Sequence, residues 1–132
     1  MNRVVHFEIQ ADDPERAAKF YREVFGWKIE KWEGSEVEYW MVMTAEMDSK
    51  EPGINGGLLR RPNKTPPQEC GTNAYVCTVQ VENFDEVAEK IIKTGGVVAM
   101  PKFALQGVAW QGYFLDTEGN TFGVHQVDEK AE

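Results

Sequence analysis

The chain has 132 residues, 42% of them hydrophobic, and carries a formal net charge of −8 at pH 7. This length and composition fit one soluble globular domain. The acidic balance argues against nucleic-acid binding, which requires clustered Lys and Arg, and no stretch reaches the length of a membrane span.

The sequence contains two related halves. Residues 4–26 align with residues 74–96 at a constant offset of 70. Each copy reads as an alternating strand, an acidic turn and an amphipathic helix. Because a unit of this size does not close a core alone, the duplication predicts a pseudo-symmetric domain with a concavity at its centre.

In the first half, residues 4–10 alternate between apolar and polar types, which predicts a strand. A helix is expected to begin near residues 12–15, where Asp, Pro and Glu favour a helix start, and to end at Gly26. Its apolar face is predicted from the helical spacing of six residues: Ala17, Ala18, Phe20, Tyr21, Val24 and Phe25. Further strands are predicted over 27–32, 37–44 and 54–60, followed by a proline-rich linker at 61–67.

The second half repeats this order. We predict strands over 75–81, 97–100, 108–115 and 121–126, with a turn at 116–120. The intervening helix ends at residues 95–96, and its apolar face is predicted to comprise Phe84, Val87, Ala88, Ile91 and Ile92. The whole chain is read as one domain, 1–132, with the order β-α-β-β-β twice. Module one spans 1–61, the linker 62–72, module two 73–127, and a charged tail, expected to fray, 128–132.

The alternation of each strand assigns residues to the two faces of its sheet. The more apolar face is expected to lie under the helix: Val5, Phe7 and Ile9 in the first half, Cys77, Val79 and Val81 in the second, and Phe122 and Val124 in the last strand. The opposite face then carries His6, Glu8 and Gln10, then Thr78 and Gln80, and finally Thr121, Gly123 and His125. A slip of one residue would invert every assignment.

The two cysteines, Cys70 and Cys77, fit a reducing compartment. The first residues lead directly into a strand pattern without an apolar signal segment, so we expect a cytoplasmic location. Cys77 lies in an alternating apolar run, which predicts a small buried side chain. Neither cysteine has a second Cys or a His at zinc-finger spacing, so no structural metal site is predicted.

Two segments carry the most specific motifs: residues 7–27, FEIQADDPERAAKFYREVFGW, and residues 113–126, YFLDTEGNTFGVHQ. Both resemble the vicinal oxygen chelate superfamily, which includes glyoxalase I, extradiol dioxygenases and bleomycin- and fosfomycin-resistance proteins. The second segment resembles the family's Asp-Pro-x-Gly-Asn turn, with Thr117 in place of the usual Pro. The resemblance covers nearly the whole chain. It implies an α+β fold in which two paired β-α-β-β-β modules form an open, cup-shaped mixed β-barrel, and it implies a homodimer.

Enzymes of this superfamily typically hold one divalent metal with side chains from the first and last strand of each module. The matching positions here are His6, Gly57 (or Gly56), Val76 and Gly123. Only His6 offers a donor, so we predict no metal ligands, no cofactor and no assigned catalytic residue. The alternative is a shifted site for one divalent ion such as Zn, Ni, Mn or Fe, held by His6 with Glu8 or His125. The side chains of His6 and Glu8 would begin roughly 6.5–7 Å apart, which is not a preorganised chelate.

The two glycines at family ligand positions allow two interpretations. Gly57 and Gly123 either leave space that enlarges the cup, or permit close strand packing or a bulge. Aromatic residues are concentrated in the second to fourth strands, and some of them serve the core or a dimer interface. We assign Trp40 and Trp110 to the pocket walls. With them, the predicted ligand-binding residues are His6, Glu8, Gln10, Thr78, Gln80, Thr121 and His125.

Four functions remain open at this stage. An aromatic, hydrogen-bonding pocket without a full metal site favours a metal-independent binder of a small organic molecule. The second possibility is a metal-dependent lyase, isomerase or dioxygenase that uses His6 with Glu8 or His125. The third is metal-free acid–base catalysis by Glu8 and His125 on a carbonyl compound. The fourth is an interaction domain whose pocket has lost its function.

Overall fold

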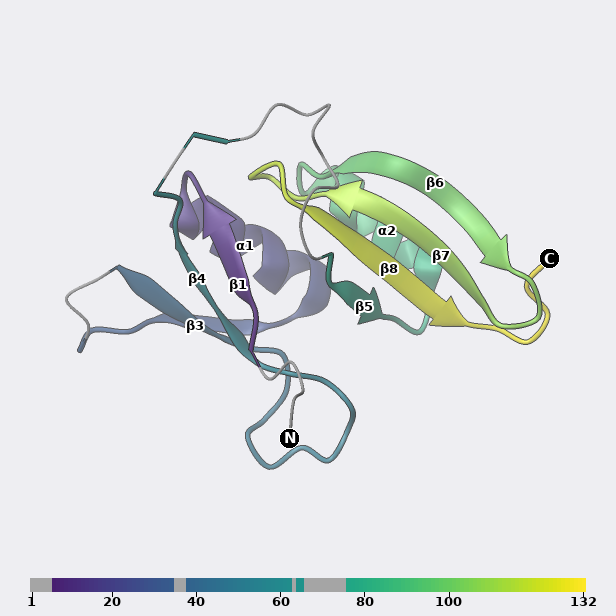
Figure 1. Ribbon diagram of the computed structural model, residues 1–132, viewed down its shortest axis with the longest axis horizontal. Helices are drawn as coiled ribbons and strands as arrows, with labels where there is room; N and C mark the ends of the chain where they lie inside the picture. Colours follow the sequence, from purple (N-terminus) through teal and green to yellow (C-terminus); the bar gives the residue numbers. More distant parts are fainter. Residues whose placement is uncertain (1–5, 35–37, 63, 66–75) are drawn as a thin grey trace. The chain divides into compact units, whose positions relative to one another are not determined.

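The computed structural model describes residues 6–34, 38–62, 64–65 and 76–132. The chain divides into two compact units, residues 1–65 and 66–132, and the division falls inside the predicted linker. Within these described ranges, each unit contains one helix and one four-stranded mixed sheet, in the order strand, helix and three strands (Figure 1). The predicted α+β class and module order are therefore confirmed. The predictions for Val4, Val5, Val37, Cys70 and Tyr75, and for most of the linker, lie outside the described residues.

Unit 1 is a sheet with one helix packed on it. It comprises β1 (Glu8–Ala11), α1 (Pro14–Phe25), β2 (Lys28–Lys31), β3 (Tyr39–Met43) and β4 (Gly56–Arg60). The sheet order is β1-β4-β3-β2, in which β1 and β4 are parallel and the other pairs are antiparallel. Helix α1 contacts β1, β2 and β4 and lies on one face of this sheet (Figure 1). We call the opposite face the open face of unit 1.

Local sequence signals set the ends of α1 where they were predicted. Asp13 is the N-cap, and its carboxylate accepts a hydrogen bond from the Arg16 N–H at 3.1 Å. Gly26 closes the helix in the left-handed region, with φ of 71°, and donates its N–H to the Arg22 carbonyl. The predicted apolar face is confirmed: five of its six residues are buried and Phe25 is half-buried.

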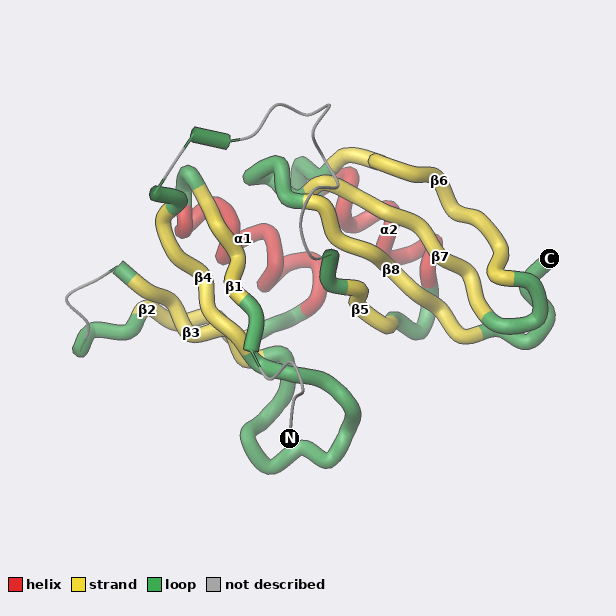
Figure 2. Tube along the Cα trace, in the orientation of Figure 1, coloured by secondary structure: helices red, strands yellow, loops and turns green. Residues whose placement is uncertain are grey.

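Unit 2 repeats the architecture. It comprises β5 (Thr78–Gln80), α2 (Phe84–Lys93), β6 (Val97–Leu105), β7 (Ala109–Leu115) and β8 (Thr121–Val127). The sheet order is β5-β8-β7-β6, with β5 parallel to β8 (Figure 2). Asn83 caps α2 by accepting a hydrogen bond from the Glu86 N–H at 3.2 Å. Helix α2 contacts β6, β7 and β8, and we call the sheet face opposite α2 the open face of unit 2.

Strand β6 is longer than predicted. It continues through Pro101 to Leu105, whereas the prediction ended it at residue 100. Proline is tolerated because β6 is the edge strand of its sheet and its register with β7 shifts between Val98 and Met100 and again between Met100 and Phe103. Edge strands and bulges are the positions where a missing N–H costs least.

Two residues assigned to buried positions are exposed. Cys77 precedes β5, which is the other edge strand of its sheet, whereas α2 packs over β6, β7 and β8. The prediction of a buried thiol is therefore wrong. Ile92 is 50% exposed, because α2 buries its apolar face through Phe84 and Ile91 instead.

The C-terminal tail is packed and not frayed, which corrects the prediction. Ala131 is buried, and its carbonyl accepts a hydrogen bond from the Gly107 N–H at 2.9 Å. Asp128 accepts hydrogen bonds from the Lys130 N–H at 2.9 Å and from Trp110 Nε1 at 3.0 Å. These contacts attach the tail to the β6–β7 connection. No helix in the described part of the chain is long and apolar enough to cross a membrane.

The turn between β7 and β8 depends on the buried carboxylate of Asp116. It accepts hydrogen bonds from the N–H groups of Glu118 at 2.8 Å and Asn120 at 2.9 Å, and from Asn120 Nδ2 at 3.1 Å.

Asp116→Ala leaves these donors without the carboxylate, so we expect the free energy of unfolding to fall by roughly 1–3 kcal/mol. Urea unfolding measures this loss. Asp48→Ala, on an exposed loop, is the control and should change the value by less than about 0.5 kcal/mol; equal effects would contradict this account.

The docked tail should also respond to acid. The Lys130 N–H, followed by the Trp110 indole, lowers the pKa of Asp128 below its ordinary value of 3.8. A carboxyl whose pKa is lower in the folded state adds stability above its unfolded pKa and loses it as pH falls through the folded pKa. The difference in free energy of unfolding between wild type and Asp128→Asn should therefore shrink below pH of about 3.8. A difference that stays constant from neutral to acid pH would contradict this role.

Candidate functional site

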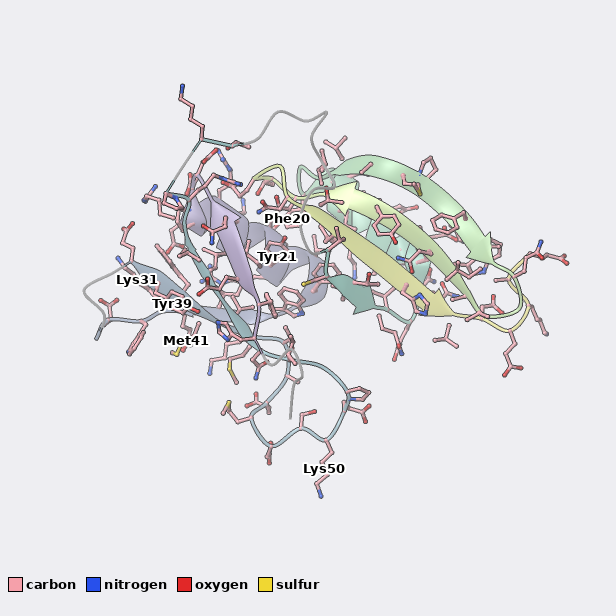
Figure 3. The ribbon with its side chains drawn as sticks, viewed as in Figure 1. Phe20, Tyr21, Lys31, Tyr39, Met41 and Lys50 are labelled. Carbon is pink, nitrogen blue, oxygen red and sulfur yellow. The ribbon has the colours of Figure 1, made fainter. Side chains whose placement is uncertain are left out.

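The open face of unit 1 combines polar residues of β1 with aromatic and methionine residues of β3. In the sheet register, Gly57 lies between Glu8 and Met41, and Tyr39 lies opposite Leu59. Side chains in register share a face, so Glu8, Tyr39 and Met41 all lie on the open face. Figure 3 labels Tyr39 and Met41 along β3. Trp32, just after β2, is 51% exposed and makes an edge contact with Tyr39 at 6.4 Å between ring centroids.

The phenol of Tyr39 joins two of the predicted site residues. Its oxygen lies 2.9 Å from His6 Nε2, and its O–H donates to Glu8 Oε1 at 3.4 Å. A carboxylate only accepts, so the geometry gives a chain in which His6 Nε2–H donates to Tyr39 and Tyr39 donates to Glu8. We call these three residues the His6–Tyr39–Glu8 cluster. Sequence reasoning placed His6 and Glu8 on this face but missed the group that connects them.

Glycine at position 57 is what makes room for this cluster. A Cβ atom on Gly57 would overlap the Tyr39 hydroxyl and ring. Tyr39 therefore reaches across β4 from β3 to meet residues of β1. Of the two interpretations of Gly57, the structure supports close packing, because a neighbouring side chain fills the space.

The environment keeps the Tyr39 phenol neutral. Burial is the largest cause that raises its pKa above the ordinary 10.0, followed by the charge of Glu8 and the hydrogen bond to Glu8. A phenol with a raised pKa donates hydrogen bonds at neutral pH and does not act as a phenolate base.

The open face of unit 2 has a matching arrangement around Gly123. A Cβ atom there would lie 2.5 Å from Thr78 Oγ1, 3.0 Å from Gln111 Nε2 and 3.2 Å from Tyr113 Cε1, so this glycine too is covered by neighbours. Gln111 Oε1 lies 2.8 Å from His125 Nδ1. The rings of Phe103 and Tyr113 are stacked at 6.5 Å between centroids. Gln111 and Phe103 were not predicted as site residues.

The two tryptophans assigned to pocket walls lie on the other faces of their sheets. Trp40 is in register with the buried Leu58, and its Nε1 donates to Glu15 of α1 at 2.8 Å. Trp110 is in register with Gln126, whose side chain accepts the Phe84 N–H at the start of α2. Both indoles are therefore on the helix side and not on the open faces, which corrects the assignment of Trp40 and Trp110 to pocket walls on the face opposite the helix. The aromatic residues of the open faces are Trp32, Tyr39, Phe103 and Tyr113.

The remaining predicted residues lie on the faces expected for them. Gln10 is half-buried on the open face of unit 1. Thr78 and Gln80 are exposed and Thr121 is half-buried on the open face of unit 2. The helix-side assignment of Phe122 and Val124 is also correct, since both are buried.

The β-α-β-β-β order, found once in each unit, defines the chain as a protein of two repeated modules. The family model of the Glyoxalase/Bleomycin resistance protein/Dioxygenase superfamily matches residues 3–124, and the chain belongs to this superfamily. It is 30% identical over 121 residues to a glyoxylase-like domain-containing protein of Didymella fabae, covering 89% of this chain and 88% of the relative.

Solved structures share the fold at lower identity. The fosfomycin resistance protein FosX of Listeria monocytogenes has a TM-score of 0.73 at 15% identity, over 97% of this chain and 93% of that chain. TnmS3, an antibiotic binding protein from Streptomyces sp. CB03234, has a TM-score of 0.67 at 22% identity, over 97% and 98% of the two chains.

The four positions that the resemblance assigns to metal ligands carry few donor atoms. His6 is the only one of the four with a donor side chain, and the spaces beside Gly57 and Gly123 hold Tyr39, Thr78 and Gln111. Within the described ranges, no group of three or more His, Cys, Asp or Glu side chains is placed to hold a metal.

The cluster makes a direct prediction about Tyr39. Glu8→Gln removes the negative charge beside the phenol, so the pKa of Tyr39 should fall toward 10.0. It should stay above that value because burial is the larger cause. NMR titration of ring-labelled tyrosine measures the change. Glu46→Gln, at an exposed loop position, is the control and should leave the Tyr39 titration unchanged; an unchanged titration in Glu8→Gln would contradict the contact.

Proposed function

We propose that this protein binds a small organic molecule without a metal ion, and that the open face of unit 1 contributes to the binding site. One observation carries the proposal: Tyr39 occupies the space above Gly57 as a neutral hydroxyl held between His6 and Glu8. At this position the face offers a hydrogen-bond donor in place of a metal ligand.

The surroundings of Tyr39 favour a planar ligand. Trp32 is half exposed beside the Tyr39 ring, and Met41 is exposed at the next open-face position of β3. Aromatic rings bury large flat surfaces, and the flexible thioether adapts to irregular ones. A planar compound with a carbonyl or ether oxygen could contact Trp32 and replace Glu8, whose oxygen lies 3.4 Å away, as the acceptor of the Tyr39 O–H. Largely apolar sites with a few placed polar groups are typical of small-molecule pockets.

The relatives support this class of ligand. TnmS3 is described as an antibiotic binding protein and FosX as a fosfomycin resistance protein, and both share the fold of this chain. Binding of an antibiotic-like compound is therefore compatible with this architecture. The donor set supports binding without a metal ion, because it offers His6 but no second donor side chain at the matching positions.

The proposal predicts ligand binding that survives metal removal. Thermal shift against a panel of planar aromatic and cationic compounds, in EDTA, should identify binders that raise the unfolding temperature. For a binder with an acceptor oxygen, Tyr39→Phe removes one hydrogen bond and should raise the Kd about three- to tenfold. Isothermal titration measures the Kd.

Tyr21→Phe is the matched control, because it removes a tyrosine hydroxyl from α1 on the helix side of unit 1. It should leave the Kd unchanged. No binding by any compound would overturn the proposal. Binding that appears only after Zn, Ni, Mn or Fe is added would favour the metal-dependent alternative instead.

A further inference from the structure

A second polar pair lies on the open face of unit 2 and has no role in the cluster of unit 1. Gln111 on β7 and His125 on β8 are directly opposite in the sheet register. Gln111 Oε1 and His125 Nδ1 are 2.8 Å apart. Gln111 is only 5% exposed, whereas His125 is half-buried.

The Gln111 amide lies between Gly123 and His125. Its Nε2 lies over Gly123, where a Cβ atom would be 3.0 Å away, and Thr78 and Tyr113 flank the same space. Its Oε1 faces the imidazole. A buried amide usually keeps the orientation that satisfies its hydrogen bonds. In the structure the side chain presents its carbonyl oxygen, and not its NH2 group, to His125.

This orientation determines which nitrogen of His125 carries the proton. A carbonyl oxygen only accepts, so Nδ1–H of His125 must be the donor. In the neutral imidazole the other nitrogen, Nε2, then has a free lone pair and acts as an acceptor. The hydrogen-bond partner of Nδ1 thus determines whether Nε2 donates or accepts a hydrogen bond.

We propose that Gln111 is a positioning residue that holds His125 as the Nδ1–H tautomer, so that Nε2 accepts a hydrogen bond from a hydroxyl or N–H group on an aromatic ligand. This inference rests on the proposed function and extends it to unit 2. The aromatic part of the ligand is indicated by Phe103 and Tyr113, which lie on the same face in register with Gln111 and Gly123. Their stacked rings offer a flat apolar surface near the acceptor.

The tautomer is measured first, in the unmodified protein without ligand. In histidine-labelled protein at a pH where imidazole is neutral, nitrogen–proton correlation spectra distinguish the protonated from the free ring nitrogen. The expected result is Nδ1–H with a free Nε2 at His125. An Nε2–H tautomer would overturn the inference whether or not any ligand binds. This result is therefore separate from the test of the proposed function.

Ligand recognition is tested with phenol and anisole, which have the same ring but differ in the hydroxyl donor. Phenol should shift the His125 Nε2 resonance and bind about three- to tenfold more tightly than anisole. Equal binding, or binding that does not perturb His125, would overturn the subsite. If neither probe binds while other panel compounds do, the subsite fails and the proposed function stands.

Two variants separate positioning from simple packing. Gln111→Met keeps a similar length but removes the acceptor, so His125 should show both tautomers and the preference for phenol over anisole should disappear. Gln111→Glu restores an acceptor opposite Nδ1 and should restore both the Nδ1–H tautomer and the preference. A Gln111→Met protein with the wild-type tautomer would overturn the positioning role.

Discussion

The polar groups on the open face of each sheet depend on one glycine. In each unit this glycine lies in the last strand, β4 or β8, and is paired with a residue of the first strand, β1 or β5. Gly57 is paired with Glu8 in parallel register, and Gly123 is paired with Thr78 in the same way. In each unit a Cβ atom at that position would collide with a polar side chain that now covers it. The polar clusters of the open faces can form only because these two side chains are missing. Close approach of neighbouring groups is a common reason for glycine within a strand.

The two units use this space in the same way but with different chemistry. Tyr39 lies opposite Leu59, two residues beyond Gly57, and Gln111 lies opposite His125, two residues beyond Gly123. Each of these side chains holds a histidine, but at different nitrogens: Tyr39 contacts Nε2 of His6, and Gln111 contacts Nδ1 of His125. The duplicated backbone thus supports a neutral phenol donor in one unit and an imidazole acceptor in the other. A duplication that had kept both halves identical could not offer both kinds of group.

Sequence patterns predicted the elements better than the orientation of individual strands. The caps of α1, the module order and the faces of β1 and β8 followed from local signals and from burial under a helix. Trp40 and Trp110 were misplaced because alternation within one strand does not reveal which of its two faces the helix covers. Register with Leu58 and Gln126 places the two tryptophans on the helix side.

The docked tail was missed because its stability comes from contacts with Trp110 and Gly107, far away in sequence. Tyr39 and Gln111 were missed as anchors because only the register brings them beside a glycine and a histidine.

Trp40 and Trp110, on the helix sides of their sheets, help to explain why each small sheet can carry polar groups on its open face. Trp40 is buried on the α1 side and donates its indole N–H to Glu15, while Trp110 donates to Asp128 and lies 4.6 Å below the Lys102 ammonium. Each large ring therefore adds apolar burial on the helix side, and its N–H still has a partner, as buried indoles require. Because burial on that side is the main source of stability, the open faces are free to carry hydroxyl, amide and imidazole groups. Under the proposed binding function, substitutions of Tyr39 or Gln111 would therefore act on recognition more directly than substitutions of the tryptophans, which would first weaken the core.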